Sequence, residues 1–507
     1  MVASTTAQPP APAAAARHPW AALAVLMLPV LLIAVDNTVL SFAVPAISEA
    51  LRPGGTQLLW IIDAYPLILA GLLVPMGSLG DRVGRRKLLL IGASGFAAVS
   101  AIAAFVPSAG LLIAARAALG FFGAMLMPAT LSLIRNIFID PTQRRTAIAI
   151  WAAGFSGGAA LGPVVGGFLL EHFWWGSVFL MAVPVLIPLL VLGPLLVPES
   201  KDPQPGPVDP VSIALSLGAM IPLVYGIKTL AESGSALAGA LPILAGLLVG
   251  WAFVRRQLRR EVPLLDVRLF TNPVFSGSVA ANLLSVFSLI GFIFFVSQHL
   301  QLVSGRTPMQ AGLFLVPGLV VTVIAGLAVV RVVRHVRPAY VVAGGLSLNA
   351  IGYTVVLISG SAGSDLGLLI AFAILGAGVG AAETISNDLI LASVPPAKAG
   401  AASAVSETAY ELGAVLGTAV LGSILTAVYR SNVVVPDQLL ADDARAAGET
   451  LGGATEVARG LPEGVARRLL DSAQHAFDSG VIFTSAIGIV LMTLAAAIAL
   501  RALRTAK

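Results

Sequence analysis

The chain has 507 residues, of which 57% are hydrophobic and only 11% are charged. Soluble domains carry roughly 25% charged residues, so a water-soluble protein of this size is excluded. Apolar stretches of about 20 residues, long enough to cross a bilayer as helices, recur along the whole length. The chain contains no cysteine, which excludes disulfides and thiolate metal sites. These features predict an all-α polytopic membrane protein.

The apolar pattern predicts fourteen transmembrane helices. The Ala/Pro-rich segment 1–19 precedes them, and we expect it to be a disordered tail. The predicted helices, in chain order, are Trp20–Val44, Leu58–Leu79, Leu88–Phe105, Gly110–Ile134, Thr146–Leu170, Ser177–Val197, Pro210–Leu230, Ala236–Val254, Val274–Leu300, Ala311–Val330, Ala339–Ile358, Leu366–Leu391, Ala401–Val428 and Val481–Leu500.

The basic residues predict the orientation of these helices. If both termini are cytoplasmic, 21 of the 30 Lys and Arg residues fall in inner segments. The short outer loops then hold three, Arg52, Lys228 and Arg306. Cytoplasmic loops of membrane proteins carry an excess of Lys and Arg. We therefore expect both termini on the cytoplasmic side.

One large outer segment is predicted, the extracellular loop 430–479. Within it, Leu461–Phe477 has the apolar spacing of an amphipathic helix. The loop is interpreted either as a solvated tether or as a gating or partner-binding element.

A glycine- and arginine-rich motif, GSLGDRVGRRK, occupies 77–87 after the second helix. Glycines permit a tight turn between helices, and an acid near a helix end can hold neighbouring arginines. An ordinary basic loop is the plainer interpretation, but the full pattern is more specific. Its defining residues are Gly77, Gly80, Asp81, Arg82, Gly84 and Arg85.

The fifth helix carries overlapping small-xxx-small spacings, Gly158/Gly162 and Gly162/Gly166. Such spacings let helix backbones approach closely in lipid. Pro163, followed by Gly166 and Gly167, removes one helical hydrogen bond and favours a kink. This helix is predicted to pack tightly against its neighbours.

Three ionisable residues lie in predicted spans of the first half: Asp36, Asp63 and Arg116. A rise of about 1.5 Å per residue puts them at a similar depth in the outer half of the membrane. A charge inside a membrane is costly and points to function. Asp36 and Arg116 are the favoured pair, and all three are candidates for proton coupling.

A second set of acids lies in the second half. Glu407 and Glu411 are one helical turn apart and face the same way, and Glu383 lies at a depth close to that of Glu407. Glu411 and Asp388 have an alternative interpretation as interfacial or structural carboxylates. Aromatic rings attract cations, although each could equally be packing. The candidates are Trp60, Tyr65, Phe155 and Tyr410.

Other classes of function lack their motifs. No phosphate-binding G-x-x-x-x-G-K-[ST] loop occurs, and neither does H-E-x-x-H nor G-x-S-x-G. His172 and His299 are isolated, and we interpret both as interfacial rather than metal-binding. No metal, cofactor or nucleic acid is therefore expected. An enzyme would need a set of nucleophile, base and oxyanion donors, and a channel would conduct without proton exchange.

These motifs resemble those of the major facilitator superfamily of secondary transporters. The motif at 77–87 is similar to its signature loop, and GPVVGG at 162–167 is similar to the signature of its proton-coupled drug exporters. Asp36 lies in AVDNTVLSFAVP, which resembles the first helix of the fourteen-helix drug:proton antiporters. Arg116 matches an arginine that this family links with proton coupling. The resemblance extends from Ala22 to about residue 500.

The resemblance implies two pseudo-symmetric six-helix bundles, at 20–197 and 272–507, that alternate access to a central site. The linker 198–271 would then hold two extra transmembrane helices. It further implies a monomeric antiporter of a bacterial plasma membrane that exchanges protons for lipophilic cations. Ethidium, quaternary ammonium compounds and fluoroquinolones are the expected substrates. A dedicated exporter of one metabolite or self-made antibiotic is the alternative.

Two departures from the family pattern limit what the resemblance implies. The second half has no clean copy of the signature loop, because GLAVVRVVRHVRP, 326–338, lacks the aspartate. The predicted helix Ala311–Val330 contains no acid, whereas some relatives carry one there. Transport of doubly charged cations is therefore not implied by the resemblance.

Overall fold

The computed structural model describes residues 18–201, 209–233, 236–261, 263–359, 365–394 and 399–506, which form helices and connecting turns. The helices are α1 (Pro19–Leu51), α2 (Gly55–Val83), α3 (Arg85–Ala103), α4 (Ala109–Ile137), α5 (Pro141–His172), α6 (Ser177–Leu180), α7 (Ala182–Leu196), α8 (Pro210–Ser233), α9 (Ala236–Arg259), η1 (Val267–Thr271), α10 (Pro273–Gln298), η2 (His299–Val303), α11 (Pro308–Val332), α12 (Pro338–Ser359), α13 (Asp365–Ala392), α14 (Ala399–Gly417), η5 (Thr418–Gly422), α15 (Ser423–Asn432), α16 (Ala441–Glu449), α17 (Leu451–Arg459) and α18 (Glu463–Ala502).

Among the described residues, thirteen helical segments are long and apolar enough to cross a membrane. They correspond to all the predicted spans except Thr146–Leu170, which lies within the 32-residue helix α5. Helix α5 packs lengthwise against α1 and α11 inside the bundle. The prediction of a helical membrane protein with about fourteen spans is confirmed.

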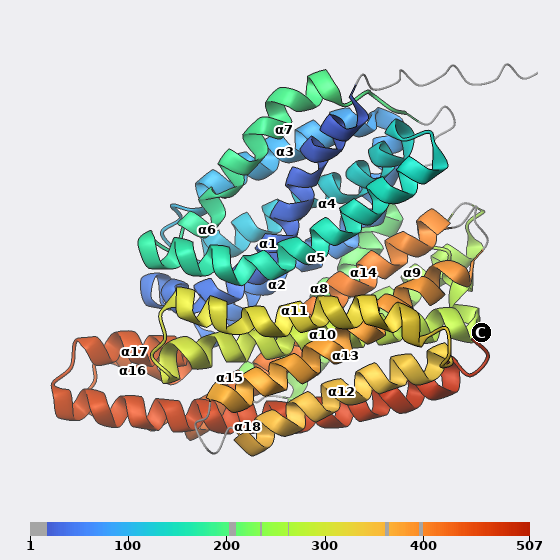
Figure 1. Ribbon diagram of the computed structural model, residues 1–507. Coiled ribbons are helices and arrows are strands. Elements are labelled where there is room, and N and C mark those ends of the chain that lie inside the picture. The colour runs from blue at the N-terminus through green and yellow to red at the C-terminus, as the bar shows by residue number, and fades with distance from the viewer. Residues whose placement is uncertain are drawn as a thin grey trace, which may run out of the picture.

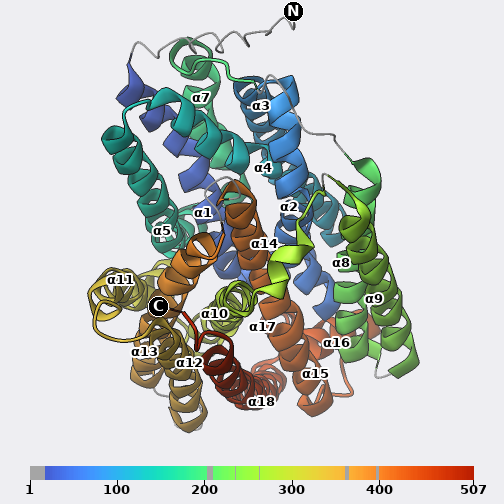
Figure 2. The same cartoon turned by 90° about the vertical axis from the view of Figure 1, so that its right-hand side faces the viewer.

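The helices gather into two bodies, one made of α1–α7 and the other of α10–α15 with α18 (Figure 1). Helices α8 and α9 pair with each other at the side of the molecule, where α8 contacts both α2 and α15 (Figure 2). The start of α1 and the end of α18 lie at the same end of the bundle. We call this the inner end, following the predicted topology, and the opposite one the outer end.

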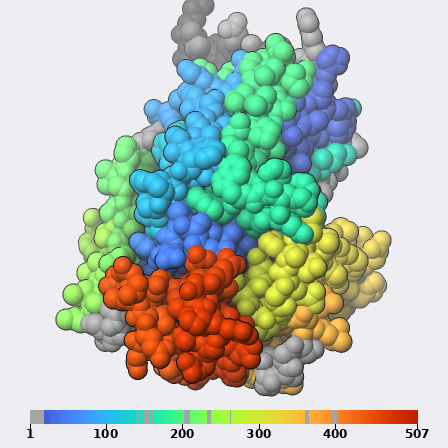
Figure 3. Space-filling view, turned by 90° about the vertical axis from the view of Figure 1, so that its left-hand side faces the viewer, coloured from blue at the N-terminus to red at the C-terminus, as the bar shows by residue number. Residues whose placement is uncertain are grey.

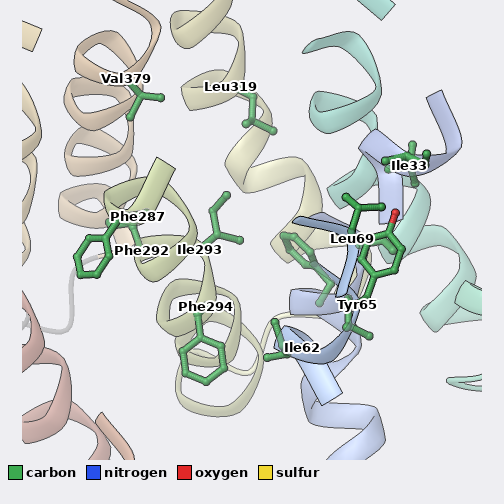
Figure 4. Packing of buried hydrophobic residues seen from close by; sticks show 14 of the residues in the cluster. Ile33, Ile62, Tyr65, Leu69, Phe287, Phe292, Ile293, Phe294, Leu319 and Val379 are labelled. Carbon is green, nitrogen blue, oxygen red and sulfur yellow. The ribbon is translucent and has the colours of Figure 1, made fainter. Parts of the chain in front are cut away.

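The two bodies share one continuous apolar core. Figure 4 shows Phe292 and Ile293 of α10 in the same cluster as Ile62 and Tyr65 of α2. The Phe292 ring stacks on Phe372 of α13, with ring centroids 5.2 Å apart. In such an apolar core a buried polar group is costly unless it finds a partner.

The glycine- and arginine-rich motif makes a tighter turn than the predicted helix bounds indicated. Helix α2 continues to Val83 and α3 starts at Arg85, so Gly84 alone separates them with φ 118°. This left-handed conformation suits glycine. A Cβ on Gly84 would also lie 2.8 Å from the carboxyl carbon of Glu199. The predicted hold of Asp81 on a nearby arginine is present, at 2.7 Å from Arg85.

Glu199, just after α7, caps the start of α3. Its two carboxylate oxygens accept hydrogen bonds from the backbone N–H groups of Arg86 and Lys87, at 3.0 and 3.1 Å. A carboxylate at a helix N-terminus satisfies free N–H groups and opposes the positive end of the helix dipole. Glu199 thereby links the turn between α2 and α3 to the segment that follows α7, the last helix of the same body.

The segment 430–479 is largely helical and not a loose tether. Leu461–Phe477 was predicted as a helix separate from the last span, and this separation is wrong. From Glu463 it is continuous with the last span in the 40-residue helix α18. Ala473 and Phe477 are buried in the core. The apolar face of this segment therefore packs against the core, and the helix continues without a break into the last membrane span.

Helices α16 and α17, here called the outer cap, close over the outer end of α1. Figure 3 looks onto this end, where the red segment that contains the cap lies against the blue segment. Arg459 of the cap pairs with Glu49 of α1 at 2.7 Å. Arg52, just after α1, lies 3.5 Å from both Asp443 and Glu456. The cap therefore links the second body to the first at the outer end.

Candidate transport site

The predicted pair of Asp36 and Arg116 is confirmed. Asp36 comes from α1 and Arg116 from α4, and an arginine Nη1 donates to Asp36 Oδ2 at 2.8 Å. The side chains are 8% and 2% exposed. Charges this deeply buried are stable only when paired and hydrogen-bonded. Pairing with Arg116 therefore explains how an aspartate is accommodated in the otherwise apolar helix α1.

Two further contacts position Arg116. Its Nε donates to the backbone carbonyl of Ile61 at 3.1 Å, which fixes the guanidinium against α2. The guanidinium carbon also lies 4.6 Å from the ring centroid of Tyr65, within the range of a cation–π contact. Tyr65 was predicted as a candidate for binding substrate cations, and the structure places its buried ring against this resident arginine.

Asp63 pairs with a residue that the sequence analysis placed elsewhere. Lys228 was counted in a short outer loop, and this is wrong. It lies within α8, with its Nζ 2.9 Å from Asp63 Oδ2 and both side chains fully buried. The Nζ also lies 4.0 Å from the ring centroid of Trp60. A lysine this deep needs a carboxylate partner, and α8 brings it to α2.

Glu411 connects the two bodies. Asn37 of α1, next to Asp36, donates to Glu411 Oε1 of α14 over 3.5 Å. Glu411 is buried, and its second oxygen has no hydrogen-bond partner among the described residues. It lies within electrostatic range of Glu407, Asp36 and Arg116. The second body thus presents a carboxylate to the acid–base pair of the first.

A narrow cavity lies between the two bodies and collects most of these groups. From the first body Asp36, Asn37, Asp63 and Arg116 reach its wall. The full lining is Asp36, Asn37, Leu40, Ser41, Ile62, Asp63, Pro66, Arg116, Ile290, Tyr410, Ala414 and Thr418. Acids, one arginine and apolar side chains therefore face one another at the junction of the two bodies.

Of the remaining predicted site residues whose side chains the structure describes, only Tyr410 lines this cavity. Glu407 is on α14 and Glu383 on α13, both partly buried. Tyr410 lies within electrostatic range of Glu383 and Glu411. Asp388 is exposed, in agreement with its interfacial interpretation. The Phe155 side chain lies outside the described part of α5.

The glycine stripe of α5 packs on α1, as its spacing predicts. A Cβ on Gly158 would lie 2.7 Å from that of Ala34. A Cβ on Gly162 would overlap the hydroxyl of Thr38, two residues from Asp36. The Thr38 hydroxyl also donates to the carbonyl of Ala159 at 3.1 Å. Close approach to α5 therefore holds the segment of α1 that carries the buried aspartate.

The end of the same motif faces the other body. A Cβ on Gly167 would lie 2.6 Å from the Cα of Met309 of α11. Gly312 of α11 in turn meets the backbone of Pro163. Helix α5 therefore contacts both bodies through small residues. Rocking of one body against the other must slide or open this contact.

Two residues at the site, Lys228 and Asn37, escaped the sequence analysis. Lys228 stands inside a predicted span, so the rule that singled out Asp36 applies to it as well. Asn37 is uncharged, and nothing in the sequence alone distinguishes it from an ordinary polar residue. Asn37 and the partner of Lys228 are therefore identified only when the helices are placed side by side.

A helical membrane bundle with two bodies and a polar cavity at their junction is the architecture of a secondary transporter. The sequence profile of the Major Facilitator Superfamily matches residues 26–418. The chain belongs to this superfamily. Among solved structures, a bacterial homolog of the human lysosomal transporter Spinster has a TM-score of 0.64, 16% identity and coverage of 96% of this chain and 98% of that one. At this identity the likeness supports the fold alone.

The chain also resembles characterised drug-efflux members. It is 59% identical to the multidrug efflux pump LfrA of Mycolicibacterium smegmatis, over 94% of this chain and 95% of LfrA. The methyl viologen resistance protein SmvA of Salmonella typhimurium is 36% identical, over 94% and 97%. The tetracenomycin C resistance and export protein of Streptomyces glaucescens is 32% identical, over 83% and 78%. The predicted membership of the drug-efflux branch, as a transporter and not an enzyme, is confirmed.

Proposed function

We propose that the protein is a proton-coupled multidrug efflux antiporter of the bacterial plasma membrane, with both termini cytoplasmic. Its substrates are small lipophilic cations such as ethidium, quaternary ammonium compounds and fluoroquinolones. The proton gradient drives export, so no cofactor takes part, and the monomer is the working unit. The similarity to the multidrug efflux pump LfrA over nearly the whole chain supports drug export.

One observation carries the mechanism: acids of the two bodies meet at their junction, where Asp36 lines the cavity and Glu411 accepts a hydrogen bond from the wall residue Asn37. A lipophilic cation favours the ionised form of such a carboxylate, whereas a proton neutralises it. The two therefore compete for the same site. Competition of this kind produces exchange without ATP.

Alternating access determines the direction of drug transport. The outer cap and the α5–α11 contact join the bodies in this conformation, so the outer side is the closed one. Rocking would open the outer end and separate the cap from α1. Entry of a proton from outside then displaces the drug, and return to the present conformation delivers the proton inside.

The direct test uses purified protein in lipid vesicles with ethidium inside and an imposed pH gradient. We expect ethidium export that stops when an ionophore clamps both sides to equal pH and voltage. Glu411→Gln, which removes the charge and keeps a hydrogen-bond acceptor, should weaken ethidium binding by about tenfold or more, equivalent to about 1.4 kcal/mol. Export that continues under the clamp would contradict proton coupling.

The second candidate is a dedicated exporter of one self-made compound, favoured by the similarity to the tetracenomycin C exporter. A deletion strain distinguishes the two. Loss of a multidrug pump raises sensitivity to several dyes and biocides at once. Loss of a dedicated exporter leaves those sensitivities unchanged and causes a single compound to accumulate in the cell.

A further inference from the structure

Helix α8 belongs to the two-helix insert that joins the two bodies in sequence, yet its Lys228 pairs with an acid on the wall of the central cavity. Lys228 Nζ lies 2.9 Å from Asp63 Oδ2, and Asp63 lines the cavity together with Asp36 and Arg116. We propose that Lys228 is a tethered counter-cation that occupies Asp63 in this conformation. It thereby keeps Asp63 out of the exchange of protons for drug. This proposal rests on the proposed function and refines it.

The geometry suits a contact that breaks and re-forms. Among the described residues, Lys228 Nζ and both Asp63 oxygens have no well-aligned hydrogen bond. The pair is held by charge and by the Trp60 ring, and Thr418 of η5 is a further polar neighbour of Asp63. Lysine is a compact charge on a flexible stem, unlike the rigid fork of an arginine. The Arg116–Asp36 pair, in contrast, is hydrogen-bonded and further tied to a backbone carbonyl. The two pairs therefore differ in how readily they separate.

The charge balance of the cavity follows from these pairs. In the first body, Asp36 is matched by Arg116 and Asp63 by Lys228. The charged groups that act on Asp63 are Lys228 and Arg116, and the one that acts on Lys228 is Asp63. Glu411 has no basic partner at ion-pair distance in the described part of the chain. The acids of the second body are thus left to hold a proton or a cationic drug.

Helix α8 is placed to sense the relative position of the bodies. Val224, one turn before Lys228, packs in a cluster with Leu67 of α2 and Val415 of α14. The same helix therefore contacts the first body and the second at the depth of the ion pair. When the bodies rock, α8 cannot keep both contacts unchanged. The Lys228–Asp63 distance is then expected to depend on the conformation.

The test counts protons released when ethidium saturates the purified protein in weakly buffered solution. Without the lysine, Asp63 would hold a proton and surrender it to the incoming cation. We expect Lys228→Met to release about one more proton per ethidium than the wild type. Lys228→Met/Asp63→Asn should return to the wild-type number. Thr229→Ala, a half-buried neighbour on the same helix whose hydroxyl donates to the Tyr225 carbonyl, is the matched control and should not change the count.

The double variant keeps the proposal testable if Lys228→Met fails to fold, because it leaves no unpaired charge. A double variant that releases about one proton fewer than the wild type would show that Asp63 already exchanges a proton beside Lys228, and this would overturn the proposal. An unchanged count in Lys228→Met would also overturn it. Failure of the proposed function is a separate result, in which the wild type neither binds ethidium nor releases protons.

If the protein does not bind ethidium, melting temperatures still test the Lys228–Asp63 pair. Asp63→Asn strands a buried ammonium, and Lys228→Met leaves Asp63 buried as an uncharged acid without its partner. Each single variant should melt below the wild type, and the double variant should melt above at least one of them. Additive losses would mean that the two side chains do not stabilise each other, and the counter-cation role would be rejected whatever the protein transports.

Discussion

Asp36→Asn is the perturbation that bears most directly on the buried pair. Asparagine keeps an oxygen near Arg116 but removes the counter-charge. Unit charges about 4 Å apart attract by about 4 kcal/mol at an effective dielectric constant of about 20, and breaking a buried pair costs about 3–5 kcal/mol. Since one hydrogen bond survives, we expect a loss of stability near the lower end, about 3 kcal/mol.

The transport defect should exceed what this loss of stability explains. In vesicles with an imposed pH gradient, ethidium fluorescence should report no gradient-driven export by Asp36→Asn, although the protein still folds. Asp36→Asn/Arg116→Gln should regain stability because both charges are gone, and it should remain inactive. Asp388→Asn, which changes an exposed carboxylate, is the control with normal export. Wild-type rates from Asp36→Asn would remove this aspartate from the coupling mechanism.

Three further substitutions probe the elements around the site. Gly162→Ala forces a methyl group against the Thr38 hydroxyl. Overpacking of this kind costs about 1–3 kcal/mol of stability, so the melting temperature should fall and export should slow. An unchanged melting temperature would mean that α1 and α5 separate freely. Arg459→Ala removes the exposed pair with Glu49, worth up to about 1 kcal/mol, so amide exchange in α17 should rise by up to about fivefold. Equal exchange would show that this pair does not hold the cap on α1. Glu199→Ala leaves the start of α3 uncapped and should cost about 0.5–2 kcal/mol, measured by thermal melting, whereas an effect on transport alone would assign Glu199 another role.

The spans and the small-residue stripe were predictable because they depend on local repetition. Twenty apolar residues predict a membrane helix wherever they occur. The four-residue spacing of Gly158, Gly162 and Gly166 places them on one face without knowledge of the partner helix. Asp36 and Arg116 were predictable as a pair because few charges stand at that depth, and a buried charge needs a partner.

The remaining features depend on contacts between segments far apart in the chain. Lys228 lies 165 positions from Asp63, and only the docking of α8 on α2 decides that the two meet. The pairing of Arg459 with Glu49 and the cap that Glu199 forms on α3 are of the same kind. A lysine near the end of an apolar stretch has the same local sequence whether it points to water or to a carboxylate. Hydropathy reports burial from water, whereas partner choice is set by the packing of whole helices, which no local pattern encodes.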